Sequence, residues 1–189
     1  MREIALHLMD IAENSVAVES RNVRIAVVED QQNNSLIVSV TDDGRGMDAD
    51  TAKRVLDPFY TTRTTRKIGL GIPLLKLAAE QCEGGLSLKT EPGKGTQVEA
   101  QFQLNHIDRM PLGDIGCTFL TLLVAHPHIH WIFEYKSINI QGAIKEFKLD
   151  DSEVKSALGD VSLTEPDVLR ILRGMIEEGI ASLAPQPEI

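Results

Sequence analysis

Two short apolar segments, joined by a polar turn, constrain the fold of this chain most strongly. In residues 22–29 and 35–41, valine, isoleucine and leucine occupy every second position. This alternation places them on one face of a strand. The residues between the segments, Asp-Gln-Gln-Asn-Asn at 30–34, are all polar and are typical of a turn. The sequence therefore predicts two neighbouring strands with one buried face.

The flanking segments supply helices and two more strands. An amphipathic helix is predicted over 3–17, a short helix that Asp48 can cap over 49–56, a further helix over 72–82, and a hairpin of strands 85–91 and 95–104. The order is helix, two strands, helix, loop, helix, two strands. It predicts an α+β fold: a two-layer α/β sandwich in which helices cover one face of a mixed sheet.

Residues 105–111 are the predicted boundary between two domains, 1–104 and 105–189. The second is expected to be a small α+β accessory module, with helices over 112–124, 151–158 and 165–182 and a hairpin of strands 128–135 and 143–149. Thr164 is expected to cap the last helix, with Asp167 in the capping-box position. The apolar stripe of that helix is expected to pack on its own hairpin.

Composition excludes several classes of function. The chain has 19 basic and 28 acidic residues and a formal net charge of −9, which disfavours nucleic-acid binding. The two cysteines form no CxxC pair, so a reducing, cytoplasmic location is expected. The longest apolar stretch, 115–125, is too short to span a bilayer, and no membrane association is expected.

The first segment that carries chemistry is Asp42-Asp-Gly-Arg-Gly46, at the end of a predicted strand. A carboxylate in this position can accept a hydrogen bond from an exocyclic amine, and the glycines Gly44 and Gly46 let the backbone approach a flat ring. Taken alone, the segment is equally well explained as a turn that caps the next helix.

A second segment, Gly69-Leu70-Gly71, precedes the predicted helix over 72–82. Glycines before a helix expose backbone N–H groups, and a helix N-terminus favours phosphate. The spacing fits neither a dinucleotide fingerprint nor a P-loop. A purely structural role for these glycines is the alternative.

Asp10 and Asn14 lie four residues apart on the polar face of the first helix. A carboxylate and an amide oxygen on one face suit coordination of a hard cation and activation of water. The alternative is an ordinary solvated helix face.

The last such segment is a basic loop in which Arg63, Arg66 and Lys67 follow Asp57-Pro-Phe-Tyr-Thr-Thr62. Such a loop can close on phosphates. An exposed loop without a function is the alternative.

Together, the order and spacing of these segments resemble the GHKL ATPase superfamily, whose nucleotide-binding domain has the Bergerat fold. Residues 8–15 (LMDIAENS) resemble its N box, 42–46 its G1 box, 57–62 the F box of histidine kinases and 69–71 their G2 box. Residues 84–87 with 93–96 (GKGT) resemble the closing hairpin. The resemblance covers residues 3 to about 104 and depends on the conjunction of motifs rather than on any one.

The resemblance implies that the chain binds ATP with Mg²⁺. Asp42 would bind the adenine amino group, aided by Thr96 and a water, and Asn14 would hold Mg²⁺ against the phosphates. Residues 69–71 would line the triphosphate beneath a lid of about 60–68. The implied nucleotide-binding set is Asn14, Asp42, Gly44, Gly46, Thr62, Arg63, Gly69, Leu70, Gly71 and Thr96, with Asn14 as the metal ligand.

Departures from the family pattern leave the reaction open. Histidine kinases carry a phosphoacceptor hairpin before the N box, whereas here the N box begins almost at Met1 and His7 is a poor substitute acceptor. Many kinases have a basic residue where this chain has Ala17, and MutL and gyrase have a glutamate as general base where it has Asp10. Two functions therefore remain. The chain could hydrolyse ATP or phosphorylate a separate protein, with Asp10 as the catalytic residue, or it could be an ATP-sensing module that controls a protein partner.

The alternating histidines His126, His128 and His130 are a further candidate metal site. On a strand, His128 and His130 would share a face. A metal site is disfavoured here because the sequence places no carboxylate or thiol beside them at ligand spacing.

Overall fold

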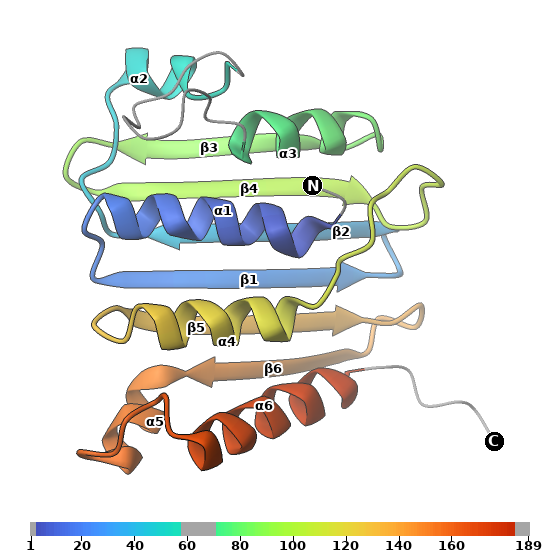
Figure 1. Ribbon diagram of the computed structural model, residues 1–189. Helices are drawn as coiled ribbons and strands as arrows, with labels where there is room; N and C mark the ends of the chain where they lie inside the picture. Colours follow the sequence, from blue (N-terminus) through green and yellow to red (C-terminus); the bar gives the residue numbers. More distant parts are fainter. Residues whose placement is uncertain (1–2, 58–70, 184–189) are drawn as a thin grey trace.

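A computed structural model describes residues 3–57 and 71–183 of the chain. A six-stranded mixed sheet forms one layer, and α1, α3, α4 and α6 cover one of its faces (Figure 1). The elements in chain order are α1 (Ile4–Ala17), β1 (Asn22–Asp30), β2 (Ser35–Asp42), α2 (Ala49–Arg54), α3 (Gly71–Glu80), β3 (Gly85–Glu91), β4 (Gly95–Gln103), α4 (Ile115–Ala125), β5 (His130–Ile138), β6 (Ile144–Asp150), α5 (Asp151–Leu158) and α6 (Pro166–Ala181). The α+β class and the two-layer arrangement are therefore confirmed.

The strands follow the order β3-β4-β2-β1-β5-β6. All neighbours are antiparallel except β1 and β5, which run parallel. Apolar side chains at alternate positions of β1 and β2 face the helices, as the sequence pattern predicted. Among the helices in the described part of the chain, none combines the length and the apolar character needed to cross a membrane.

Residues beyond the predicted boundary continue the same sheet. Strand β5 pairs with β1 from Asn22 opposite His130 to Asp30 opposite Ile138. The boundary segment itself lies against the start of α1, where the N–H groups of Ile4 and Ala5 donate to the carbonyls of residues 111 and 112 at 3.0 and 2.8 Å. Those N–H groups belong to the first helical turn, which has no partners within the helix. The segment after residue 104 thus completes α1.

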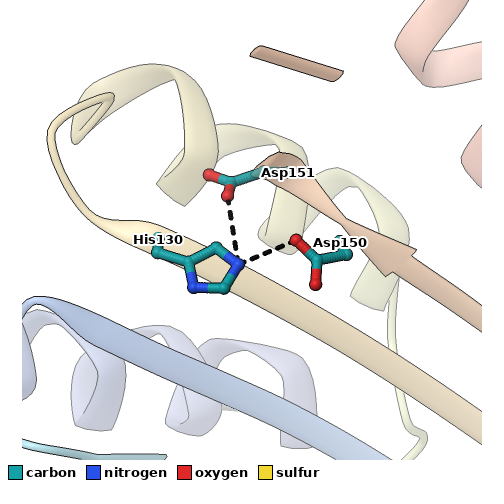
Figure 2. Close-up of side chains that lie close together, drawn as sticks. All are labelled: His130, Asp150 and Asp151. Atoms are coloured by element: carbon teal, nitrogen blue, oxygen red, sulfur yellow. Dashed lines mark hydrogen bonds and ion pairs between the residues drawn. The ribbon is translucent and has the colours of Figure 1, made fainter. Parts of the chain in front are cut away.

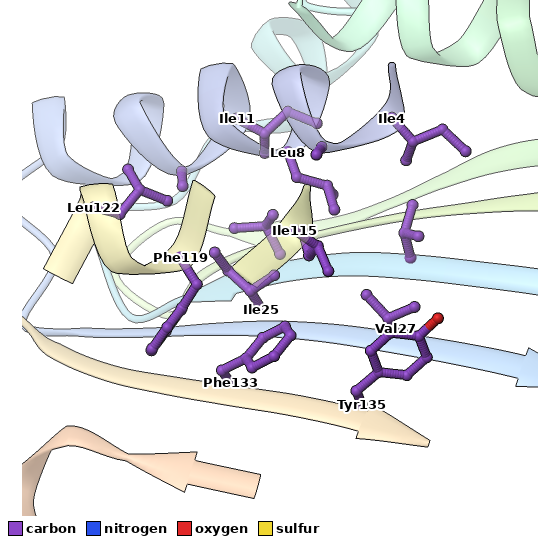
Figure 3. Packing of buried hydrophobic residues seen from close by; sticks show 14 of the residues in the cluster. Ile4, Leu8, Ile11, Ile25, Val27, Ile115, Phe119, Leu122, Phe133 and Tyr135 are labelled. Carbon is purple, nitrogen blue, oxygen red and sulfur yellow. The ribbon is translucent and has the colours of Figure 1, made fainter. Parts of the chain in front are cut away.

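The core lies between the sheet and α1 and α4 (Figure 3). Phe119 of α4 stacks on Phe133 of β5 with ring centroids 5.1 Å apart, and both rings are fully buried. The indole of Trp131 is also fully buried and donates to the carbonyl of His126 at 3.1 Å. The aromatic residues on β5 are core residues, and they join the strand to the N-terminal elements.

The start of the last helix differs from the sequence-based expectation. Helix α6 is preceded by Glu165 at the N-cap, without a side-chain cap, and Thr164 instead bonds to Ser162 in the turn. Pro166 at the first helical position starts the helix one residue later than a Thr164 cap requires. On α1, His7 is only 2% exposed, because α3 packs against this helix.

The apolar stripe of α6 also contacts more than its own hairpin. Its buried residues, Val168, Leu172 and Ile176, face inward, and α6 packs on α4 as well as on β6. A β-carbon on Gly116 of α4 would lie only 2.8 Å from Ile176, so the missing side chain allows this close approach. The prediction of a hairpin contact was therefore incomplete.

Candidate functional site

The carboxylate of Asp42, at the end of β2, is held from two sides. Its Oδ2 accepts a hydrogen bond from the Ser15 hydroxyl of α1 at 2.7 Å, and its Oδ1 accepts one from the Gly44 N–H at 2.9 Å. Ser15 is 2% exposed, whereas Asp42 is half-buried. The carboxylate is therefore oriented by the protein but remains accessible to a ligand.

The turn after Asp42 lies close to the β3–β4 hairpin. Gly46 has a φ of 62°, and a β-carbon there would lie 1.9 Å from the Glu91 carbonyl oxygen. The Gly93 N–H donates to the Arg45 carbonyl at 2.7 Å. The left-handed conformation and this contact together require glycine at position 46.

Thr96 lies directly opposite Asp42 in the antiparallel pair β2–β4. Directly opposed residues project from the same face of a sheet, so the two side chains are neighbours. The Thr96 hydroxyl lies 3.1 Å from that of Thr90, which also accepts a hydrogen bond from the Met47 N–H at 2.9 Å. The structure thus brings Asp42, Gly44, Gly46 and Thr96 together, and Thr90 connects the hairpin to the turn.

On the other side of Ser15, α1 meets the start of α3. A β-carbon on the buried Gly71 would lie 2.7 Å from the Asp10 Oδ2. On the same helix the pKa of the buried His7 is lowered, chiefly because burial disfavours the charged ring. Asp10 and Asn14 lie one turn apart on α1 and are half-buried. The expected juxtaposition of this helix face with the second glycine segment is therefore present at Gly71.

Four of the expected binding residues, Thr62, Arg63, Gly69 and Leu70, lie outside the described residues, as does the expected lid of 60–68. Within the described part, the candidate site has two groups. The first consists of Asp10, Asn14 and Gly71, and the second of Asp42, Gly44, Gly46 and Thr96. Ser15 of α1 bonds to the second group and follows Asn14 in the chain, so one helix positions both.

Asp43, to which the sequence pattern assigned no specific role, anchors the site to β1. Its Oδ1 accepts from the N–H groups of Arg21 and Asn22 at 2.8 and 2.9 Å, and its Oδ2 accepts from the Asn22 side-chain amide at 2.6 Å. Burial opposes ionisation of Asp43, but the donors from Asn22 and Arg21 outweigh it, and the pKa is lowered. Its partners are more than 20 residues away, so local sequence could not identify them.

Comparison with known proteins agrees with this arrangement. The family model described as "Histidine kinase-, DNA gyrase B-, and HSP90-like ATPase" matches residues 1–106. Sensor protein kinase FleS of Pseudomonas aeruginosa is 37% identical over 89 residues, which cover 47% of this chain and 22% of that protein. Sporulation kinase E of Bacillus subtilis is 34% identical over 90 residues, covering 47% of this chain and 12% of that protein. This chain therefore matches less than a quarter of the length of either relative.

A solved structure, the N-terminal domain of a DNA repair protein, shares the fold with a TM-score of 0.52 at 14% identity. That match covers 79% of this chain and 53% of the other. The shared fold thus includes part of the segment after residue 106. Because the family model matches more than half of the chain, we conclude that this protein belongs to the histidine kinase-, DNA gyrase B- and HSP90-like ATPase family and contains its ATP-binding domain.

Proposed function

We propose that the chain binds ATP through Asp42 and Thr96, with Mg²⁺ at Asn14. One observation supports the adenine assignment most directly: the Asp42 carboxylate is fixed by Ser15 and Gly44 beside Thr96, with Asp42 itself half-buried. A carboxylate oriented in this way can accept a hydrogen bond from the adenine amine. The Thr96 hydroxyl can supply a second polar contact.

The phosphates would then extend toward Gly71 and the N-terminus of α3. Gly71 packs closely against Asp10, where a side chain would clash. Separately, the backbone N–H groups at the start of a helix can bind an anion. The donor set fits Mg²⁺, which prefers oxygen ligands, because the Asn14 side chain offers an amide oxygen on the face shared with the Asp10 carboxylate. When bound, the ion would neutralise part of the phosphate charge. The proposal also includes residues 62, 63, 69 and 70, and only the family resemblance supports their inclusion.

Calorimetric titration with ATP, ADP and GTP tests the assignment. Asp42→Asn replaces one of the two acceptor oxygens with an NH₂ donor group, at a cost of about 1–3 kcal/mol or roughly one to two decades in Kd. ADP should bind, because the base contacts are retained, and GTP should bind weakly, because its base has a carbonyl where adenine has an amine. Asp160→Asn, at an exposed position in the turn before α6, is the matched control. Equal ATP affinity of Asp42→Asn and the wild type would refute the assignment.

For the reaction, we propose hydrolysis of ATP or transfer of its γ-phosphate to a separate protein. The relatives named as kinases support a protein acceptor. In this proposal Asp10, one helical turn before Asn14, takes the proton from the attacking water or hydroxyl group. We place this reaction in the cytoplasm. The two cysteines, Cys82 and Cys117, are free thiols, which fits a reducing compartment.

Variants of Asp10 separate catalysis from the alternative, an ATP-sensing module. A general base typically contributes 10²–10⁴-fold to the rate and little to ground-state binding. Asp10→Asn should therefore keep ATP affinity and lose turnover, whereas Asp10→Glu should retain turnover. Absence of both hydrolysis and phosphotransfer in the wild type, with ATP binding intact, would favour the sensing module.

A further inference from the structure

A cluster of metal-ligating side chains lies at the start of β5, away from the nucleotide site. The imidazole of His130, on β5, meets the carboxylates of Asp150 and Asp151, at the junction of β6 and α5 (Figure 2). The His130 Nε2 lies 2.7 Å from the Asp150 Oδ1 and 3.8 Å from the Asp151 Oδ1. One ligand atom from each residue falls within 4.8 Å of the other two.

Asp151 is the unusual member of this cluster. Its side chain is fully buried, and its Oδ1, which faces His130, accepts no hydrogen bond from any residue that the structure describes. The other oxygen, Oδ2, forms an ion pair with Lys155 at 2.6 Å. A buried carboxylate oxygen without a donor is costly. A bound cation would remove that cost.

The hydrogen bond at the other ring nitrogen of His130 leaves the Nε2 lone pair available to bind a metal ion. The Asp43 carboxylate can only accept, so the Asn22 side-chain amide must point its NH₂ group toward Asp43, and its Oδ1 toward the His130 Nδ1 at 2.8 Å. Nδ1 is then the protonated nitrogen of the neutral ring. In that tautomer the lone pair of Nε2 faces the Asp150 Oδ1 at 2.7 Å. Both atoms are then hydrogen-bond acceptors, so a cation or a proton must lie between them to offset their repulsion. A hydrogen bond that fixes the free nitrogen of the ring is the usual support of a histidine ligand.

We propose that His130 Nε2, Asp150 Oδ1 and Asp151 Oδ1 bind a divalent transition-metal ion of the Zn²⁺ class. One imidazole with two carboxylates suits such an ion, with water in the remaining position. Bonds of about 2.0–2.2 Å in a tetrahedron separate neighbouring ligand atoms by roughly 3.3–3.6 Å. The two contacts of Nε2, at 2.7 and 3.8 Å, bracket that separation, so small side-chain rotations suffice.

The surroundings of the cluster hold the two aspartates in place. Asp150 is the N-cap of α5, and its Oδ1 accepts from the N–H and hydroxyl groups of Ser152. The Lys155 ammonium group donates to the Ile129 carbonyl at 2.6 Å and holds the far oxygen of Asp151. Lys155 lowers the net charge of the two carboxylates from −2 to −1, so the site has enough negative charge for a divalent ion but weaker affinity than without the lysine.

Calorimetric titration of the full chain, freed of metal and nucleotide, with ZnCl₂ tests the proposal. The wild type should take up one equivalent at this site with a micromolar or tighter Kd. Zn²⁺ at a hundredfold excess over Kd should raise the Tm by roughly 5–10 °C. His130→Gln should lose that equivalent or weaken it at least about tenfold. His128→Gln, at an exposed position two residues earlier, is the matched control and should bind like the wild type.

A second variant and a second probe guard against loss of folding. Asp150→Asn retains a side-chain oxygen for the N-cap and removes the charge, so it should keep the fold and lose the ion. Co²⁺ should give intense visible absorption bands in the wild type but not in His130→Gln. Equal Zn²⁺ uptake by wild type and both cluster variants would overturn the proposal. Absence of uptake by the wild type would also overturn it and would leave a protonated His130 as the bridge between the carboxylates.

Discussion

The hydrogen bond from Ser15 to Asp42 should contribute to both stability and nucleotide affinity, and Ser15→Ala separates the two contributions. The bond joins α1 to β2 at 2.7 Å, and its acceptor is a carboxylate. Hydrogen bonds to charged groups contribute about 1.5–3 kcal/mol. Water can replace the hydroxyl at the half-buried carboxylate, so we expect the lower part of that range, about 1.5–2 kcal/mol. For a chain of this size the Tm should fall by roughly 3–8 °C.

The effect of Ser15→Ala on ATP binding should be smaller than that of Asp42→Asn. The Gly44 N–H still holds one carboxylate oxygen, so the main loss is orientation of the side chain. Fixing such a side chain costs about 0.5–1.5 kcal/mol, which corresponds to roughly 2- to 12-fold in Kd. Thermal melting and calorimetry measure the two effects, with Ser87→Ala at an exposed position of β3 as control. An unchanged Tm, or an affinity loss as large as that of Asp42→Asn, would refute this reasoning.

Two further predictions concern the framework of the site. Gly46→Ala should lower the free energy of unfolding by at least about 2 kcal/mol in urea titrations, because left-handed strain adds to a clash with the Glu91 carbonyl. Gly93→Ala, at a φ of 76° with open space around it, should cost only the strain, about 1–2 kcal/mol, and equal losses would contradict the clash. The second prediction concerns His7, whose pKa is lowered from 6.5 in the folded chain, so the unfolded chain binds more protons as the pH falls below about 7. The free energy of unfolding should therefore decrease from pH 7.5 to 5.5 more in the wild type than in His7→Gln, and parallel profiles would exclude this contribution.

Sequence periodicity predicted the helices and strands well because most of them have one buried face. The alternation in β1 and β2 and the stripe on α1 repeat at the period of their own element, so a local window contains the information. The motifs were equally local: Asp42 with its following glycines occupies five consecutive residues. The sequence could therefore predict the Asp42 end of the candidate site and the face of α1 that holds Asp10 and Asn14.

Contacts between distant segments could not be predicted in the same way. The boundary expected at 105–111 marks a change of element, but the register of β5 on β1 is set by pairing across more than 100 residues. The alternating histidines illustrate the same limit. His126 bonds to Glu13 of α1, whereas His130 meets carboxylates 20 residues further along. Spacing in the sequence places no carboxylate beside His130, but β6 folds back antiparallel to β5 and brings Asp150 next to it.

The position of β1 explains how the two parts of the chain are mechanically connected. One edge of β1 pairs with β2, which ends in Asp42, and its other edge pairs with β5, which begins at His130. At the start of β1, the Asn22 side chain bonds to Asp43 with its NH₂ group and contacts His130 with its oxygen. A shift of β5 relative to β1 would therefore disturb Asp43, the residue next to the proposed adenine ligand. The backbone pairing along all of β1 opposes such a shift, so the segment after residue 104 helps to hold in place the strand that supports the proposed nucleotide site.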